Sequence, residues 1–338
     1  MCGRGRQSAT PAAMREVARR DAGVPASAPW AHADAYAPTE NLCPGRSAAV
    51  VVAASRAKGD DASEPHLCTP HLCTKRWGLV ARYDASATPD FWRMFNARSE
   101  TLHTSPVFRR LLRSRRCAVP LDGFFEWTDD EMKAAKATKQ PWYVHHTSGG
   151  PLWLAGLHDT QSSTELETFT LITMDVDPKL SWLHDRQPVL LDAAGLALWL
   201  APPPTAADDE ATPEDGKGSA SSPSKEQHDH TATLDALKRV LPASELKWHA
   251  TTKKMSKVEY QESDASLPVK LPSQQQRSVA SFFARKPGPS PTAASSSSQG
   301  AKVASPPASS PSPIAAAFKR GASEEKGSDV AKQPRTHK

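Results

Sequence analysis

Residues 116–127 read RCAVPLDGFFEW, and this stretch is typical of the architecture expected for the whole chain. Its first half, Arg116–Leu121, is a short apolar run that predicts a buried β-strand. Similar runs occur at Ala48–Ala53, Arg76–Val80, Pro141–Val144, Leu152–Leu157, Thr168–Thr173, Pro188–Leu191 and Leu246–Ala250. Helical patterns are fewer, at Thr10–Arg20, Ser105–Arg113, Ala193–Leu200 and Ala232–Val240. Many short strands with interspersed helices predict an α+β domain built around antiparallel sheet.

Composition divides the 338 residues into a folded part and a tail. We predict a domain over residues 1–265, interrupted at about 202–230 by an acidic insertion without large apolar residues, which we expect to be disordered. Residues 266–338 are rich in Ser, Pro, Ala and Lys and predict a disordered tail. The tail has 11 Lys and Arg against 3 Asp and Glu, and a basic arm of this kind suits nucleic acid.

The cysteines and the N-terminus indicate a reducing compartment. The five cysteines are an odd number, and no secretory leader follows the charged start of the chain, so we expect free thiols. No run of about 18 apolar residues occurs, so we expect no membrane span.

Cys2 is the first residue with distinctive chemistry. Removal of Met1 would leave a chain that begins with an α-amine and a thiol on adjacent carbons. The amine titrates near about 7.7–8.0 and the thiol near about 8.5, so both have reactive fractions at neutral pH. An amine adds to an aldehyde to give a Schiff base, and the neighbouring thiol can then close a five-membered thiazolidine ring. The ring-opened sugar of an abasic site in DNA presents such an aldehyde.

Three further segments combine residue types that catalysis needs. Residues 95–101, FNARSET, place an amide, a guanidinium and a carboxylate close together. Residues 122–127, DGFFEW, set the carboxylate of Glu126 between aromatic residues, which would raise its pKa and make it a better acid near neutrality. Residues 184–188, HDRQP, put an imidazole two residues from an arginine. Taken singly, each of these segments also suits an ordinary surface loop or strand end.

Taken together with the N-terminal Met-Cys-Gly-Arg, these segments resemble the SRAP (SOS response-associated peptidase) family. The resemblance extends in order over roughly residues 1–260. It implies a mostly antiparallel sheet that forms a barrel-like core with flanking helices. The matching segments are residues 1–4, 41–44, 76–80, 96–101, 116–120, 122–127, 154–157, 169–173 and 184–188.

The resemblance also implies roles for individual residues. Cys2 would be the nucleophile that links to the abasic sugar, and Asn96 would orient the N-terminal residue or the sugar. Glu126 would be a general acid and base, and His184 a second proton-transfer group needed also for reversal of the crosslink. Single-stranded DNA would be bound by Arg4, Pro44, Trp77, Arg98, Trp127 and Arg186, the arginines on phosphates and the tryptophans stacked on bases.

The chain departs from the family pattern in three places. Gln187 stands where the family usually has Met. Ala81-Arg82-Tyr83 replaces a Pro-x-Trp, and residues 255–258 lack the Asn of a late Val-Asn element. These changes affect the expected shape of the DNA groove and not the covalent chemistry.

A second motif lies in the tail. Residues 276–283, QRSVASFF, fit the pattern of peptides that bind the PCNA sliding clamp: Gln276, the aliphatic Val279, then the paired aromatics Phe282 and Phe283. One helical turn would place the last three side chains on one side, as a plug for an apolar pocket.

Several interpretations stay open. His66, Cys68, His71 and Cys73 lie in a tandem repeat that could ligate zinc, although we favour a small loop duplication and expect no metal or cofactor. We expect a monomeric nuclear protein that guards abasic single-stranded DNA at replication forks. The alternatives are a cysteine peptidase that acts on other proteins and a non-covalent reader of modified bases in DNA.

Overall fold

The computed structural model describes residues 2–54, 69–128, 139–202 and 233–271. They all belong to one compact unit, residues 1–285. The predicted insertion, most of the predicted tail and the clamp motif at Gln276–Phe283 therefore lie outside the described residues, as do His66 and Cys68.

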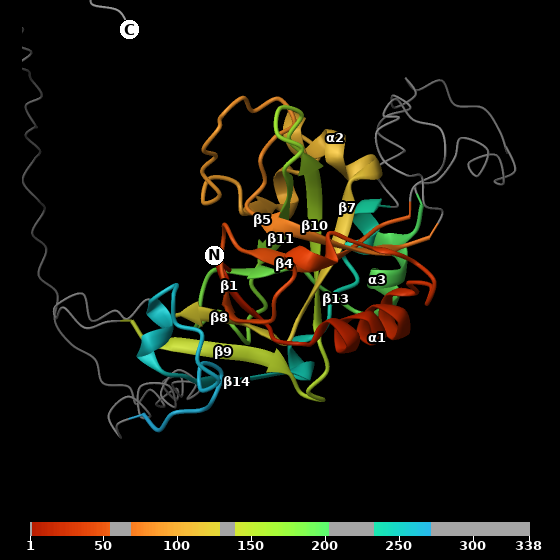
Figure 1. Cartoon of the computed structure of the whole chain (residues 1–338). Helices are drawn as coiled ribbons and strands as arrows, with labels where there is room; N and C mark the ends of the chain where they lie inside the picture. Colours follow the sequence, from red (N-terminus) through yellow and green to blue (C-terminus); the bar gives the residue numbers. More distant parts are fainter. Residues whose placement is uncertain (1, 55–68, 129–138, 203–232, 272–338) are drawn as a thin grey trace, which may run out of the picture. The chain divides into compact units, whose positions relative to one another are not determined.

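A closed five-stranded barrel is the centre of the fold (Figure 1). The ring of neighbours is β4–β5–β11–β10–β7 and back to β4, in which β5 and β11 pair in parallel and the other pairs are antiparallel. The bounds are β4 Ser47–Val52, β5 His71–Trp77, β7 Arg116–Leu121, β10 Leu152–Thr160 and β11 Glu167–Asp175. The short strands β2 Trp30–Ala31, β6 Asn96–Arg98, β12 Arg186–Pro188 and β13 Leu190–Leu191 pair with β5, β11, β11 and β10. The prediction of a mostly antiparallel, barrel-like core is confirmed.

A second sheet lies beside the barrel, with the strand order β14-β9-β8-β1-β3. Its strands are β1 Arg4–Gln7, β3 Thr39–Leu42, β8 Gly123–Trp127, β9 Pro141–His146 and β14 Leu246–Ala250. The turn at Asp122 joins β7 of the barrel directly to β8 of this sheet. The stretch 116–127 therefore connects the two sheets, and β1 lies between β8 and β3 with Arg4 opposite Phe125.

The helices cover the outside of the barrel. α1 Pro11–Ala22, α2 Pro106–Ser114 and α3 Ala193–Leu200 contribute buried residues to the same apolar cluster as Val51, Ala118 and Ile172 of the barrel. Their strand neighbours Val50, Cys117 and Leu171 belong to another cluster, which also contains Cys2 and residues of the second sheet. This division follows from the alternation of side chains along a strand. Short 3-10 turns lie at Ala33–Ala35, Ser99–Thr101, Ala243–Glu245 and Lys253–Ser256.

Most predicted elements are present, and three predictions were wrong in part. The strand predicted at Arg76–Val80 is β5, which begins earlier, at His71, so the second copy of the tandem repeat lies in a strand and not in the expected loop. This strand ends at Trp77, because Gly78 has a φ of 107° and Phe91 packs so closely that a side chain there would collide with its backbone. The strand predicted at Pro188–Leu191 is two short strands, β12 and β13. The helix predicted at Ala232–Val240 is a single helical turn over residues 233–236 within the described part of the chain.

Candidate active site

Cys2 is fully buried and lies two residues before the start of β1. The side-chain amide of Asn96 on β6 donates a hydrogen bond to the Cys2 carbonyl, with the nitrogen 2.9 Å from the oxygen. Burial, together with the nearby charge of Glu126, raises the pKa of the Cys2 thiol to about 12. The thiol is therefore protonated at neutral pH, and the site does not contain a preformed thiolate.

Glu126 is buried on β8. It lies two residues after Phe124, which pairs with Gly5 of β1. Burial raises the pKa of its carboxyl group, against the lowering effects of the N-terminal amine, of the His184 charge and of the Trp127 N–H, whose nitrogen is 3.4 Å from Glu126 Oε1. Glu126 thus interacts electrostatically with both Cys2 and His184. A buried carboxyl group with a raised pKa can donate or accept a proton near neutrality, as the sequence predicted.

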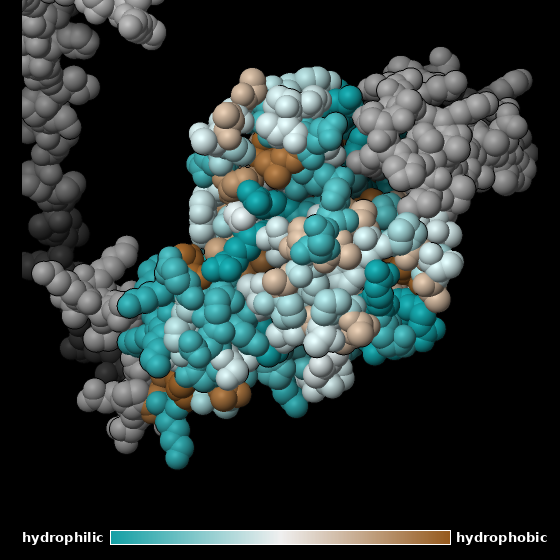
Figure 2. All heavy atoms as spheres, viewed as in Figure 1, coloured by the Kyte–Doolittle hydropathy of each residue, from teal (hydrophilic) through white to brown (hydrophobic). Residues whose placement is uncertain are grey.

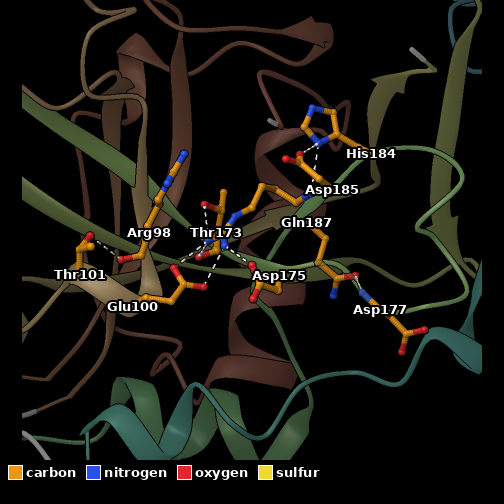
Figure 3. A network of polar contacts seen from close by, with 10 residues as sticks. Arg98, Glu100, Thr101, Thr173, Asp175, Asp177, His184, Asp185 and Gln187 are labelled. Atoms are coloured by element: carbon orange, nitrogen blue, oxygen red, sulfur yellow. Dashed lines mark hydrogen bonds and ion pairs between the residues drawn. The ribbon is translucent and has the colours of Figure 1, made fainter. Parts of the chain in front are cut away.

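His184 lies in the segment between β11 and β12 (Figure 3). Its Nδ1 accepts a hydrogen bond from the Arg186 backbone N–H at 3.1 Å and lies 2.5 Å from Asp185 Oδ1. The imidazole is about one-fifth exposed, so it borders both the buried Glu126 and the surface. The fold therefore brings together Cys2, Asn96, Glu126 and His184 from four separate parts of the chain.

Asn96 also offers an acceptor. Its Oδ1 is buried and has no hydrogen-bond partner among the residues that the structure describes. A buried acceptor without a partner is costly unless something fills it, and it is common where a ligand is to be bound. Asn96 therefore can hold the Cys2 carbonyl with one end of its amide and a donor of the bound species with the other.

Two of the predicted phosphate ligands are bound within the protein. The guanidinium of Arg4 donates to Asn41 Oδ1 at 3.1 Å and to the Met255 carbonyl at 3.0 Å, and it lies over the Trp127 ring. The guanidinium of Arg186 donates to Glu100 at 2.9 and 3.0 Å and to Asp175 at 2.5 Å. Either arginine would have to exchange these partners to bind a phosphate.

Arg98 differs from both, because it is exposed and points away from Glu100 (Figure 3). Trp127 is half-buried, and its indole N–H donates to Ser256 Oγ at 3.3 Å. Arg98 is therefore open to solvent, Trp127 is open only in part because Arg4 lies over its ring, and Pro44 is buried. The predicted stacking role of Trp77 was wrong, because Trp77 is fully buried with its ring stacked on Phe169 and its indole N–H bonded to the Phe95 carbonyl.

Sequence reasoning did not single out two exposed aromatic residues as candidates for binding. Trp92 is 48% exposed and packs edge-on against Phe95, the residue before Asn96, and Tyr83 is 82% exposed. A signal was present, because both stand in a polar segment without a strand pattern. On the face in Figure 2, hydrophobic residues lie in small separate groups on a hydrophilic surface.

Within the described ranges, no group of three or more His, Cys, Asp and Glu side chains is placed to hold a metal ion. Cys2, Cys43, Cys73 and Cys117 are all free thiols. None of the helices in the described part of the chain is both long and apolar enough to cross a membrane.

Comparison with known proteins gives a consistent result. Residues 1–221 match the model of the family described as SOS response associated peptidase (SRAP). An abasic site processing protein of Saccharomyces cerevisiae is 36% identical over 118 residues, which are 35% of this chain and 31% of the yeast protein. The abasic site processing protein YoaM of Bacillus subtilis is 32% identical over 176 residues, 51% of this chain and 70% of YoaM. The chain thus spans about a third of the yeast relative's length.

A solved structure has the same fold. The crystal structure of a protein from Bacteroides thetaiotaomicron superposes with a TM-score of 0.56 over 80% of this chain and 100% of that one. The two sequences are 17% identical, so this similarity concerns the fold alone.

Proposed function

The chain belongs to the SOS response-associated peptidase family, and from that premise we propose that it processes abasic sites in single-stranded DNA by bonding to them through Cys2. Proteins named for abasic site processing are among its relatives, which supports this substrate. The observation that carries the proposal is the position of Cys2. It is held by Asn96 and lies close enough to the Glu126 carboxylate for the two to interact electrostatically.

The covalent step begins once Met1 has been removed. The free α-amine of Cys2 attacks the sugar aldehyde, and the adduct loses one water to give an imine. The thiol then adds to the imine carbon and its proton passes to the nitrogen. One C–N and one C–S bond form, the C=O bond is lost as water, and nothing is oxidised or reduced.

Proton transfer in this sequence falls to Glu126 and His184. The closed sugar must move a proton between two oxygens before it presents an aldehyde, and a buried carboxyl group with a raised pKa is suited to that task. The same group can protonate the departing oxygen when water leaves. His184 reaches both Glu126 and solvent, so it can pass the proton outward or return it when the crosslink reverses.

The DNA strand would contact residues whose side chains are at least partly open to solvent. Arg98 suits a phosphate, and Trp127, Trp92 and Tyr83 offer faces on which bases stack without sequence preference. Binding should weaken as salt rises, because phosphate contacts release counterions.

A gel assay tests the covalent proposal. Wild-type protein and single-stranded DNA with one abasic site should give a shifted band that resists heat and detergent, and Cys2→Ala should give none. Cys2→Ser retains the amine and a hydroxyl, so it should form a labile imine that survives only after borohydride reduction. A heat-stable band of wild-type intensity from Cys2→Ala would contradict the mechanism. Cleavage of an unrelated peptide that depends on Cys2 would favour the peptidase alternative.

We propose further that the tail brings the protein to replication forks in the nucleus. Residues 276–283 have the spacing of a sliding-clamp ligand, and a tether of this kind raises local concentration without changing the active site. The full chain should bind purified PCNA, and replacement of both Phe282 and Phe283 by Ala should abolish binding while the crosslinking rate on free DNA is unchanged. Equal clamp binding by this variant would refute the tether.

A further inference from the structure

The segment that carries His184 is anchored to the body of the protein by apolar contacts. Leu180 and Leu183 are buried in the same cluster as Cys2. Trp182 packs edge-on against Trp142 of the second sheet, with ring centroids 4.8 Å apart. Apolar burial is non-directional, so these contacts hold the segment down without fixing the direction of the imidazole.

Polar contacts at the two ends of this segment constrain its orientation. The Val176 N–H donates to the Asp185 carbonyl, with nitrogen and oxygen 3.2 Å apart, and so joins the two ends through the backbone. Gln187 adds a second bond from its side chain, because its Oε1 accepts from the Asp177 N–H at 2.9 Å (Figure 3). Gln187 is buried on β12, where it pairs with Met174 of β11. Asp177 is thereby tied to the strand that follows His184.

The imidazole takes its orientation from the same short strand. His184 Nδ1 is bonded to the backbone N–H of Arg186, the residue that precedes Gln187. On its other side, Arg186 is fixed through its guanidinium to Glu100 and Asp175. Any rotation of the backbone at 186–187 therefore turns the bond that orients the ring, and the Gln187 carboxamide opposes that rotation.

We propose that Gln187, which stands in this chain where the family usually has Met, is a positioning residue for His184. It acts by holding the ends of the 176–185 segment together through a bond that Met would not make, so the departure affects more than the shape of the DNA groove. The inference rests on the proposed function for its kinetic consequence, but not for its structural one. Within the described part of the chain, the hydrogen bond of the Gln187 side chain is to Asp177 and not to Cys2 or Glu126, so Gln187 acts through the segment and not on the bound sugar.

Three variants separate positioning from general stability. Gln187→Met keeps the length of the side chain and removes the carbonyl acceptor, whereas Gln187→Glu retains an oxygen acceptor. Gln140→Met is the matched control, because Gln140 is also buried and its amide bonds the Thr251 carbonyl at 2.7 Å, outside the 176–185 segment. All three are compared at matched fractions folded, from urea titrations.

The first measurement uses no DNA. The ring-proton NMR shifts of His184, assigned by their loss in His184→Ala, should move in Gln187→Met, return toward wild type in Gln187→Glu, and stay unchanged in Gln140→Met. Unchanged His184 shifts in Gln187→Met would overturn the proposal, whatever the protein does to DNA.

The second measurement is the single-turnover crosslinking rate between pH 5 and 9. Gln187→Met should lower the rate about tenfold and alter its pH profile when His184 is present, and change it less than about twofold in a His184→Ala background. Equal losses in both backgrounds would show a merely structural role and overturn the positioning claim. Absence of any crosslink from wild type would instead refute the proposed function and leave the NMR test to decide on Gln187.

Discussion

Among the described residues, two buried cysteines each lie near a glutamate, and a comparison of these two pairs explains why one of them is suited to chemistry. Cys2 lies near Glu126, and Cys73 on β5 lies near Glu167 on β11. Both thiols are protected from water, and burial raises the pKa of each to about 12. The cysteines alone would not distinguish the two sites.

The carboxyl groups do distinguish them. Lys75 donates to Glu167 at 2.9 Å, and with the Cys73 thiol it lowers the pKa of Glu167 although burial opposes that shift. Burial raises the pKa of Glu126, and the cationic groups that act against this rise are the N-terminal amine and the His184 imidazole. A carboxylate held ionised by a lysine is a structural ion pair, whereas a carboxyl group held near its neutral form can exchange protons.

The hydrogen bonds of the two sulfur atoms also differ. Cys73 Sγ lies 3.0 Å from Glu167 Oε2 and donates to it, so that its proton is engaged. Cys2 Sγ donates to the Arg4 carbonyl over a longer distance of 3.9 Å. The contrast gives four predictions, in order of decreasing effect.

The largest effect is expected from the cysteines themselves. Cys2→Ala should abolish heat-stable crosslinking, because both the ring closure and the trapping of the imine need the thiol. Cys73→Ala should change the crosslinking rate by less than about twofold and lower stability by about 1–2 kcal/mol, as for other small losses from a core. Rates from gel band intensities and unfolding by urea measure the two effects. Equal loss of crosslinking in both variants would remove the distinction.

Next come the carboxyl groups, compared as glutamines of the same shape. Glu126→Gln should lower the crosslinking rate by about 10²-fold or more, the usual contribution of a positioned acid or base. Glu167→Gln should change it by less than about threefold. Quenched time courses with the same abasic oligonucleotide give both rates, and a Glu126→Gln rate within threefold of wild type would disprove general acid–base catalysis by this residue.

Removal of Lys75 should lower the stability of the protein, because it breaks the ion pair with Glu167. Lys75 is 2% exposed at its side chain, and Lys75→Met leaves Glu167 as a partly buried charge without its main partner. We expect a loss of about 3 kcal/mol in the free energy of unfolding, near the lower end of the range for broken buried pairs because Glu167 is 19% exposed. Lys179→Met, at an exposed position, should cost less than about 0.5 kcal/mol in the same urea experiment.

The smallest effect concerns the stability cost of Glu126. Its pKa is raised in the folded state, so the folded protein disfavours ionisation, and stability declines as pH rises from the unfolded value near 4.5. Glu126→Gln should therefore be more stable than wild type at pH 7, by about 0.5–2 kcal/mol, and no more stable at pH 4. Glu167 has a lowered pKa, so Glu167→Gln should be less stable at pH 7 and lose that difference as pH falls below about 4.5. Urea titrations at the two pH values check both signs.

Four of the five barrel strands, β4, β7, β10 and β11, were predictable from the sequence because each contains a short apolar run, whereas most of β5, HLCTKRW, was missed. The predicted bounds of β7, Arg116–Leu121, and of α3, Ala193–Leu200, agree with the structure. The strands that build the site were not predicted as strands. β1, RGRQ, and β6, NAR, are short and polar, and they form strands only because neighbours on both sheets complete their hydrogen bonds.

The predicted catalytic residues do lie together, whereas the predicted DNA ligands divide into groups. Spacing along the chain could not show that Trp77 faces the core or that Arg186 is already paired with Glu100 and Asp175. Nor could it show that Lys75 lowers the pKa of Glu167, whereas burial raises the pKa of Glu126. These properties depend on which side chains meet across the sheets, and the three-dimensional arrangement decides that.

The most direct test is the intact mass of the protein–DNA adduct. The proposed chemistry predicts the mass of the chain without Met1, plus the oligonucleotide, minus one water, with no increase of two mass units after borohydride treatment because the ring contains no imine. Digestion should place the adduct on the peptide that begins at Cys2. Retention of Met1 in the adduct, or attachment at a lysine, would contradict the account.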